Sequence, residues 1–275
     1  LKAAFVQFAN SVPANGVVIL CADDPHLRSM RADIKRHVVT YGLQEGADVM
    51  ASNLQMKGFG SVCSVRSRRP GGRDVELGEL RLSVPGRHNV LNALAAVAMA
   101  RELGVAFTDV PRAMGGFHGA ERRFQRRGEA KGVTVVEDYG HHPTEVAAVI
   151  AAAGPIAAER LVVVFQPHRF TRTQSLMKEF GRAFAGADVV VLTDIYGAGE
   201  DPIAGVTLEA LAGAVRAEFT GDLHVVPALS DVPGSVAALA RAGDLVVLLG
   251  AGSIGSTAGA VLDALETVHG AQDKS

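Results

Sequence analysis

The feature that most constrains the fold is an alternation, in the second half of the chain, of short apolar runs with alanine-rich stretches. The apolar runs are strand candidates, at 133–137, 161–166, 188–195, 223–227 and 244–249. The alanine-rich stretches are helix candidates, at about 144–153, 173–185, 207–218, 231–241 and 256–267. Helices that join successive strands make right-handed crossovers, so the pattern predicts an α/β fold with a doubly wound, mostly parallel sheet.

The first part of the chain is less regular. The apolar run 16–21 predicts a buried strand, and residues 37–41 predict a short second one. Between 47 and 84, short apolar runs separated by Gly, Ser and Arg indicate hairpins, with a turn at 68–73. A long helix is expected to open within 84–89 and to end near residue 103.

Length and composition allow two domains. A chain of 275 residues with 48% hydrophobic and 20% charged residues is globular and can bury two cores. The glycine cluster Gly115–Gly119 is a suitable hinge, so we expect domains at 1–119 and 120–275. The start, Leu1–Val6, has the pattern of the middle of an amphipathic helix, so we expect a fragment of a longer protein.

Charge and cysteine content exclude several classes of protein. A net charge of −2 gives no bulk attraction to nucleic acid or to a membrane surface. No apolar run approaches the ~20 residues of a membrane span. Cys21 and Cys63 lack metal-site spacing, and two thiols in so long a chain imply no disulfide framework, which is typical of the cytosol.

Two strand candidates end in ionisable residues where a helix is expected to begin. The first runs through Val136–Glu145 and the second through Phe165–Arg172. The carboxyl ends of strands form the ligand crevice of an open α/β sheet, so we expect the two segments to build one site.

The first of these segments holds Asp138, His141 and His142, which are possible metal ligands. Adjacent residues of an extended loop point apart, so binding of one ion by both imidazoles is disfavoured and polar recognition is favoured. The following residues, Pro143–Glu145, suit the first turn of a helix.

The second segment holds a cationic cluster, His168, Arg169 and Arg172. Such a cluster fits a carboxylate or phosphate, and Asp138 lies beside it if the two strands are neighbours. Opposite charges close together fit a small zwitterion such as an amino acid. An internal salt bridge has the same pattern in sequence and remains an alternative.

Three further motifs each carry a functional and a structural interpretation. Asn89 and Asn92 lie one helical turn apart and can read an adenine edge, or can cap the helix beside a satisfied His88. The run Glu121–Phe124, with Arg126, Arg127 and Lys131 nearby, can close onto phosphate or be a solvated charge run. The loop Gly250–Gly255 matches a dinucleotide-binding fingerprint, which would indicate a nicotinamide-dependent dehydrogenase. Too little chain follows the loop for a second βαβ unit, so a tight turn between strand and helix is the favoured interpretation.

Taken together, these segments resemble the Mur ligases along essentially the whole chain. The resemblance rests on GRHNVLNALAA (86–96), ERRFQ (121–125), VEDYGHHPTEV (136–146), FQPHRFTRT (165–173) and DIYGAGE (194–200). Within the family, the strand-end motifs are similar to those of the ligases that add L-alanine to UDP-N-acetylmuramate. A recycling ligase that adds a tripeptide is the alternative, and it usually differs at Tyr139-Gly140.

The resemblance implies a three-domain enzyme, of which this chain holds the latter part of the central α/β ATPase domain (1–119) and a C-terminal Rossmann-like domain (120–275). It implies ATP-driven amide-bond formation through an acyl phosphate, with UDP-N-acetylmuramate, L-alanine and ATP as substrates, in the bacterial cytoplasm. Neither a nucleic-acid partner nor membrane insertion is expected. No G-K-[ST] loop occurs in the 275 residues, so the fragment alone is expected not to cleave ATP, and the ligands of Mg²⁺ are expected upstream. A non-catalytic relic that binds nucleotide or a partner is a further alternative.

The resemblance also implies roles for individual residues. Positions around ATP are His88, Asn89, Asn92, Arg123 and Asp138. Positions around L-alanine are Tyr139, His141, His168, Arg169 and Arg172, of which His141, His168 and Arg169 are the catalytic candidates; none is implied to bind metal. Phe170 stands where the family often has Tyr, and Ser253 replaces an Asp that is common in the final glycine loop.

Overall fold

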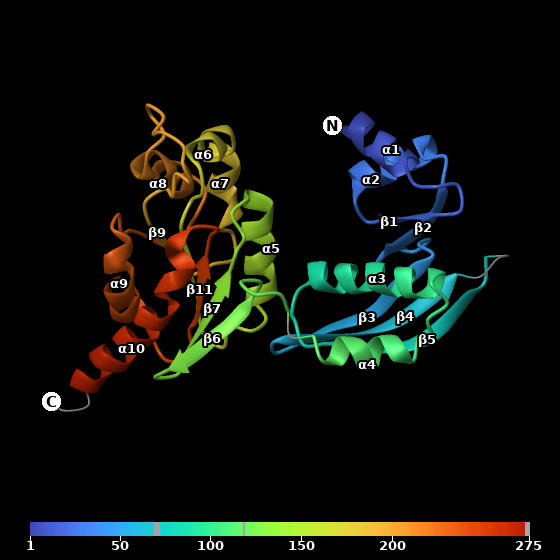
Figure 1. The fold of residues 1–275 in the computed structure, drawn as a ribbon. Helices are drawn as coiled ribbons and strands as arrows, with labels where there is room; N and C mark the ends of the chain where they lie inside the picture. The colour runs from blue at the N-terminus through green and yellow to red at the C-terminus, as the bar shows by residue number, and fades with distance from the viewer. Residues whose placement is uncertain (69–71, 118, 273–275) are drawn as a thin grey trace. The chain divides into compact units, whose positions relative to one another are not determined.

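The computed structural model describes residues 1–68, 72–117 and 119–272 and divides the chain into two compact units. The N-terminal unit is Leu1–His118 and the C-terminal unit is Gly119–Ser275 (Figure 1).

The N-terminal unit is built on a five-stranded sheet of order β1-β2-β3-β4-β5. The strands are β1 (Val17–Cys21), β2 (His37–Gly42), β3 (Val49–Lys57), β4 (Gly60–Arg68) and β5 (Asp74–Leu82). β1, β2 and β3 are parallel, and the pairs β3–β4 and β4–β5 are antiparallel. The helices are α1 (Lys2–Asn10), α2 (Pro25–Met30), the short 3₁₀ helix η1 (Arg31–Asp33), α3 (Arg87–Glu102) and α4 (Asp109–Gly115). α3 packs on β1, β2 and β3 through an apolar face that includes Val90, Leu94 and Val97.

The C-terminal unit is built on a six-stranded sheet of order β10-β9-β8-β11-β7-β6. Its strands are β6 (Gln125–Ala130), β7 (Val133–Asp138), β8 (Leu161–Phe165), β9 (Val189–Leu192), β10 (Asp222–Val225) and β11 (Leu245–Leu249). Its helices are α5 (Pro143–Ala153), α6 (Phe170–Ser175), α7 (Met177–Ala183), α8 (Leu208–Arg216), η2 (Leu229–Asp231), α9 (Val232–Leu239), η3 (Ser253–Thr257) and α10 (Ala258–Gln272). Only β6 runs antiparallel to its neighbour, so the predicted α/β fold with a mostly parallel sheet is confirmed.

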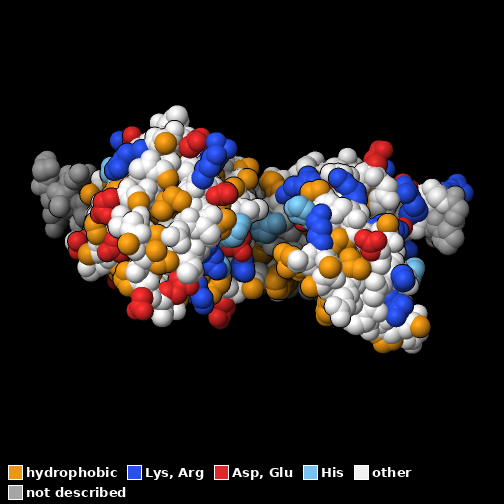
Figure 2. All heavy atoms as spheres, turned by 90° about the horizontal axis from the view of Figure 1, so that it is seen from above, with side chains coloured by type: hydrophobic (Ala, Val, Ile, Leu, Met, Phe, Trp, Pro, Cys, Tyr) orange, Lys and Arg blue, Asp and Glu red, His pale blue; other side chains and the backbone are white. Residues whose placement is uncertain are grey.

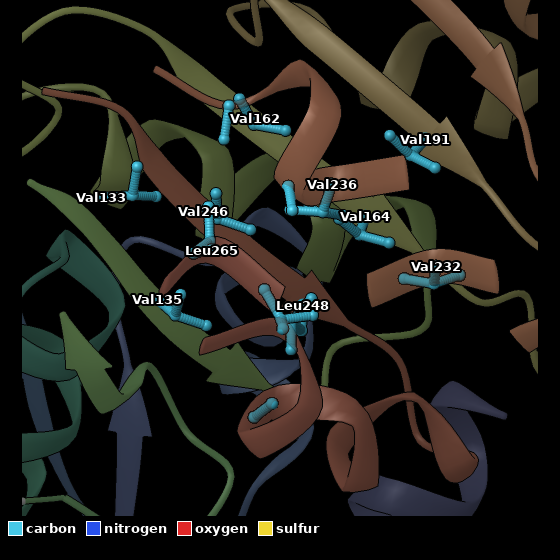
Figure 3. Packing of buried hydrophobic residues seen from close by; sticks show 14 of the residues in the cluster. Val133, Val135, Val162, Val164, Val191, Val232, Val236, Val246, Leu248 and Leu265 are labelled. Carbon is cyan, nitrogen blue, oxygen red and sulfur yellow. The ribbon is translucent and has the colours of Figure 1, made fainter. Parts of the chain in front are cut away.

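The core of the C-terminal unit explains why its strands are continuous apolar runs. β8 and β11 are buried along their whole length, because helices cover both faces of a parallel sheet. α9 and α10 pack together on one face, while α5, α7 and α8 cover the other (Figure 1). Figure 3 shows the first of these layers, in which alternate strand valines meet apolar residues of the two helices: Val133, Val135, Val162, Val164, Val191, Val232, Val236, Val246, Leu248 and Leu265.

Two features of this sheet were not predicted. β7 and β8 are not neighbours, because β11 pairs with both of them and lies between them. Strand order depends on how the whole chain crosses over, and no local pattern in β7 or β8 records the later insertion of β11. The arginine-rich segment Gln125–Ala130 was not expected to be a strand, but it pairs with β7 at the edge of the sheet, where charged side chains have access to water.

The surface fits the small net charge. On the face shown in Figure 2, acidic and basic side chains are interspersed with apolar ones over the C-terminal unit. Among the described residues, no helix is both long and apolar enough to cross a membrane.

Candidate functional site

Asp138 ends β7 and organises the loop that follows it. Its carboxylate is 4% exposed, and it accepts hydrogen bonds from the backbone N–H groups of Phe124 (2.8 Å) and Gly140 (2.6 Å). A side chain at Gly140 would meet Asp138 and Leu249, so the tight approach requires glycine. Asp138 therefore fixes the backbone on both sides of the strand end.

The loop then enters α5 through a capping arrangement. Pro143 occupies the first turn of α5, and the side chain of His142 accepts a hydrogen bond from the backbone N–H of Thr144 (3.2 Å). Glu145 accepts from the N–H groups of His141 (2.9 Å) and His142 (3.1 Å). Burial opposes ionisation of Glu145, but these two donors outweigh it and hold the pKa of the carboxyl below its ordinary value.

Arg169 follows β8 in a strained backbone conformation. Its φ of 72° lies in a region that L-residues rarely occupy, and its N–H donates to the carbonyl of Tyr196 (2.8 Å). The guanidinium is half exposed and lies 3.5 Å from the carboxylate of Glu200. Glu200 also accepts from the backbone and hydroxyl of Thr171, and these bonds are the main reason that its pKa is lowered. The strain and the ion pair aim the guanidinium away from the core.

His168 is held between Arg172 and Tyr196. The guanidinium of Arg172 lies 3.1 Å from Nδ1 of His168, and the Tyr196 ring stacks on the imidazole at a centroid distance of 5.6 Å. Burial, followed by the nearby His141, Arg172 and Arg169, lowers the pKa of His168. The ring is therefore held in its neutral form near neutral pH.

The two strand ends meet although β11 separates the strands. The rings of His141 and His168 lie 5.4 Å apart, and His141 also contacts the ring of Tyr139 at 5.4 Å. With Tyr196, these residues form a continuous row of four rings, which we call the ring row. The two segments that were expected to build one site therefore meet at the carboxyl ends of β7 and β8, with Arg172 in contact with His168.

The loop Gly250–Gly255 packs against Tyr196 of the ring row and is held by the half-buried Arg122 and the buried Gln166. Arg122 binds Glu137 at 2.6 Å and donates to the carbonyls of Gly250 and Gly252, both at 3.0 Å. Gln166 accepts from the backbone N–H of Ile254 at 2.9 Å. The glycines thus form a tight turn, followed in the described chain only by η3 and α10, which argues against a dinucleotide cradle.

The arginines of the segment Glu121–Arg127 lie in two different environments, which the sequence alone did not distinguish. Arg122 is bound to Glu137, and Arg126 and Arg127 pair with Glu129 and Glu137. Arg123 is exposed, and its guanidinium lies 5.7 Å from the centre of the Tyr139 ring, which Arg122 also approaches at 4.9 Å. The basic run is therefore not simply solvated, because three of its arginines pair with carboxylates.

The start of α3 holds the candidate residues of the N-terminal unit. The side-chain amide of Asn89 donates to the carbonyl of Pro85 (2.7 Å) and steadies the helix start. Asn92, one turn further on, is exposed, and its side chain makes no hydrogen bond to another of the described residues, while His88 is half-buried. Arg87 pairs at 2.8 Å with Asp23, a buried carboxylate at the end of β1 that the sequence analysis did not single out.

The described residues contain no group of three or more His, Cys, Asp or Glu side chains arranged to hold a metal ion.

Comparison with known families agrees with this geometry. Residues 1–100 match the Mur ligase middle domain, and residues 122–252 match the Mur ligase glutamate ligase domain. These two matches account for most of the chain, which therefore belongs to the Mur ligase family.

Its relatives include proteins named UDP-N-acetylmuramate–L-alanine ligase. That of Syntrophus aciditrophicus is 45% identical over 98% of this chain and 55% of its own length. That of Salinibacter ruber is 46% identical over 98% of this chain and 56% of its own length. The chain thus spans about half the length of the curated relatives it matches.

Solved structures support the fold. The crystal structure of UDP-N-acetylmuramate–alanine ligase from Thermotoga maritima superposes with a TM-score of 0.75 at 23% identity, covering 97% of this chain and 54% of the other. A murein peptide ligase from Psychrobacter arcticus gives a TM-score of 0.67 at 21% identity, covering 97% of this chain and 55% of the other.

Proposed function

We propose that this chain is part of an ATP-dependent ligase that joins L-alanine to the muramate carboxylate of UDP-N-acetylmuramate, in cytoplasmic peptidoglycan precursor synthesis. The observation that carries the proposal is the cluster of His168, Arg169 and Arg172 against His141, in a chain whose relatives at 42–46% identity are named for this reaction. Residues 1–119 are proposed as the latter part of the central ATP-binding domain, and residues 120–275 as the C-terminal domain.

We propose residues for contact with ATP in each unit separately, at the start of α3 in the N-terminal unit and at the end of β7 in the C-terminal unit. The exposed amide of Asn92 and the amide of Asn89, beside His88, suit an adenine edge, because an amide donates and accepts together. Arg123 is an exposed cation suited to an oxyanion, and Asp138 holds the backbone from which Arg123 and Tyr139 project.

The alanine site is proposed to lie along the ring row. The Arg169 guanidinium suits the carboxylate of L-alanine, and Arg172 keeps His168 oriented. In the reaction, the muramate carboxylate takes the γ-phosphoryl group of ATP to give an acyl phosphate, the alanine amine attacks it, and phosphate leaves. Positioning and charge stabilisation dominate such a reaction, and residues on separate strand ends can supply both.

Magnesium is not assigned to the residues described. We propose that Mg²⁺ is bound by a part of the full-length enzyme outside this chain, which spans about half the length of its curated relatives, and no step above passes through the ion.

The test is phosphate release by the full-length enzyme with ATP, Mg²⁺ and UDP-N-acetylmuramate, with and without L-alanine. We expect release to require L-alanine and to be weak with D-alanine. Release driven equally well by a tripeptide would favour a recycling ligase instead, and release indifferent to every amine would overturn the proposed alanine site.

A further inference from the structure

Tyr196 is a component of the ring row that no motif in the sequence analysis assigned a role. It follows β9, is 41% exposed, and stacks on His168 at an interplanar angle of 23°. Its backbone is tied to the same segment twice, since its N–H donates to Pro167 and its carbonyl accepts from Arg169, both at 2.8 Å.

The packing on the other side of Tyr196 leaves it little freedom. A Cβ at Gly252 would lie 2.7 Å from the Tyr196 ring, so the glycine loop presses directly on the aromatic side chain. The ring is therefore held between the loop after β11 and the imidazole of His168, and it fixes the plane of that imidazole.

The hydrogen bonds of the two histidines define which ring nitrogen carries a proton. A guanidinium only donates, so Nδ1 of His168, which receives Arg172 at 3.1 Å, is unprotonated and its hydrogen is on Nε2. A carbonyl only accepts, so Nδ1 of His141, which lies 2.9 Å from the Tyr139 carbonyl, carries the proton. In a neutral His141 the basic lone pair is therefore on Nε2.

We propose that Tyr196 is a positioning residue which, with Arg172, holds His168 as a neutral Nε2–H donor beside His141, whose Nε2 is an acceptor. The neighbouring imidazoles, tilted by 44° with centroids 5.4 Å apart, thus present one donor and one acceptor rather than two equivalent bases. The groups that surround the pair are Arg169, Arg172, Glu145 and Glu200, and the burial and cations that lower the pKa of His168 agree with its neutral form.

This arrangement deepens the proposed ligase function, on which its chemical use rests. Nε2 of His141 takes one proton from the alanine ammonium, and the freed amine lone pair attacks the acyl-phosphate carbon. The new C–N bond forms, the C–O bond to phosphate breaks, and a second amine proton leaves with the phosphate. The Nε2–H of His168 donates a hydrogen bond to an oxygen of the substrate. If Nε2 of His168 were unprotonated, like that of His141, it could not donate this bond.

The test is ¹⁵N NMR of the chain labelled at the histidine ring nitrogens. The nine histidines are assigned with single His→Gln variants, at about pH 8, above the ordinary histidine pKa of about 6.5. We expect opposite tautomers, with His168 protonated at Nε2 and His141 at Nδ1. In Tyr196→Ala we expect the His168 signals to move to a tautomer average, while Tyr196→Phe keeps the signature because it keeps the stacked ring.

Two results would overturn the proposal: the same tautomer at both histidines of the unsubstituted chain, or a His168 signature unchanged in Tyr196→Ala. The first needs no variant, so it stands even if a substitution disturbs folding. Neither needs ligase activity, and a chain with opposite tautomers but no alanine-dependent phosphate release in the full-length enzyme would sink the ligase function alone. In that enzyme, Tyr196→Ala should lower kcat roughly three- to tenfold and leave the KM for ATP unchanged, with Tyr196→Phe restoring kcat.

Discussion

The two candidate regions of this molecule are built on opposite plans. At the carboxyl edge of the C-terminal sheet, each candidate side chain is held by another: His168 by Arg172 and Tyr196, and Arg169 by Glu200. At the start of α3, the candidates follow one another along a single helix, and Asn92 is exposed.

At the strand-end site, the same residues are proposed to contact the substrate and to hold their neighbours in place. At the start of α3, these two roles fall on different residues. At the strand-end site, a residue that would touch the substrate also orients its neighbours, so its removal disturbs several groups at once. At the start of α3, support comes from Asn89 and Arg87, whereas Asn92 is left for contact alone. The predictions below test this contrast in order of expected effect.

The largest effect is expected from Gly255→Ala. A Cβ there would collide with the carboxylate of Glu137 and separate it from Arg122, which would leave this buried charge with only the longer ion pair to Arg127. We expect a loss of about 3 kcal/mol in the free energy of unfolding, measured by chemical denaturation.

The matched control is Gly213→Ala, in the middle of α8, where no atom lies within 4 Å of the added Cβ. Alanine is the better helix former, so this change should stabilise the protein by up to about 1 kcal/mol. Equal losses of unfolding free energy in the two variants would show that the Arg122–Glu137 ion pair does not stabilise the fold more than an ordinary surface position does.

Arg169→Ala in the full-length enzyme is expected to raise the KM for L-alanine far more than the KM for ATP. Loss of a charge-assisted contact to the carboxylate costs about 1.5–3 kcal/mol, or roughly 10- to 100-fold in KM. Arg169→Lys keeps the positive charge but not the planar guanidinium. Its KM for L-alanine should therefore lie between that of the unsubstituted enzyme and that of Arg169→Ala. An equal rise in both KM values would remove Arg169 from the alanine site.

Asn92→Ala should weaken ATP binding without weakening the fold. The lost amide contact costs about 1 kcal/mol, roughly fivefold in the KM for ATP, while alanine in an exposed helix position does not destabilise. Asn89→Ala is the matched comparison, because it also removes the bond to Pro85 and should lower the free energy of unfolding by about 1 kcal/mol. If both variants lose stability equally, support and contact are not separated in α3.

The smallest effect is a pH dependence that passes through His168. Its pKa is lowered in the folded state, so on acidification the unfolded chain binds the proton first, near the ordinary value of about 6.5. The free energy of unfolding should therefore fall as the pH drops from about 7.5 to about 5.5, and it should fall less in His168→Gln. Denaturation curves at several pH values measure the slope, and identical slopes in the two proteins would contradict a lowered pKa of His168 in the folded state.

The sequence predicted what depends on local pattern. The strands β7, β8 and β11 are unbroken apolar runs, and Pro143–Glu145 carry the chemistry of a helix start, so both could be recognised directly. The place of β11 between β7 and β8 could not, because it is decided by packing across the whole unit.

The same limit applies to single residues. Arg122 and Arg123 are adjacent and chemically identical in the sequence, yet one is bound to Glu137 and the other is exposed. Arg122 differs from Arg123 in having a positive φ and in its bond to Glu137, fifteen residues further along the chain. Neither property can be predicted from the motif itself. The same is true of Tyr196, whose role depends on contact with His168.

The position of β11 between β7 and β8 also affects when, during synthesis of the chain, the two strand ends can come together. On the ribosome, β7 emerges with β6, and β8, β9 and β10 follow, but neither group can join the other until residues 245–249 have been made. Without β11, the sheet lacks the strand that pairs with both β7 and β8, and the two histidines of the ring row follow these two strands. β11 is the last strand of the described residues, so a product that stops before Leu245 lacks the strand that joins β7 to β8.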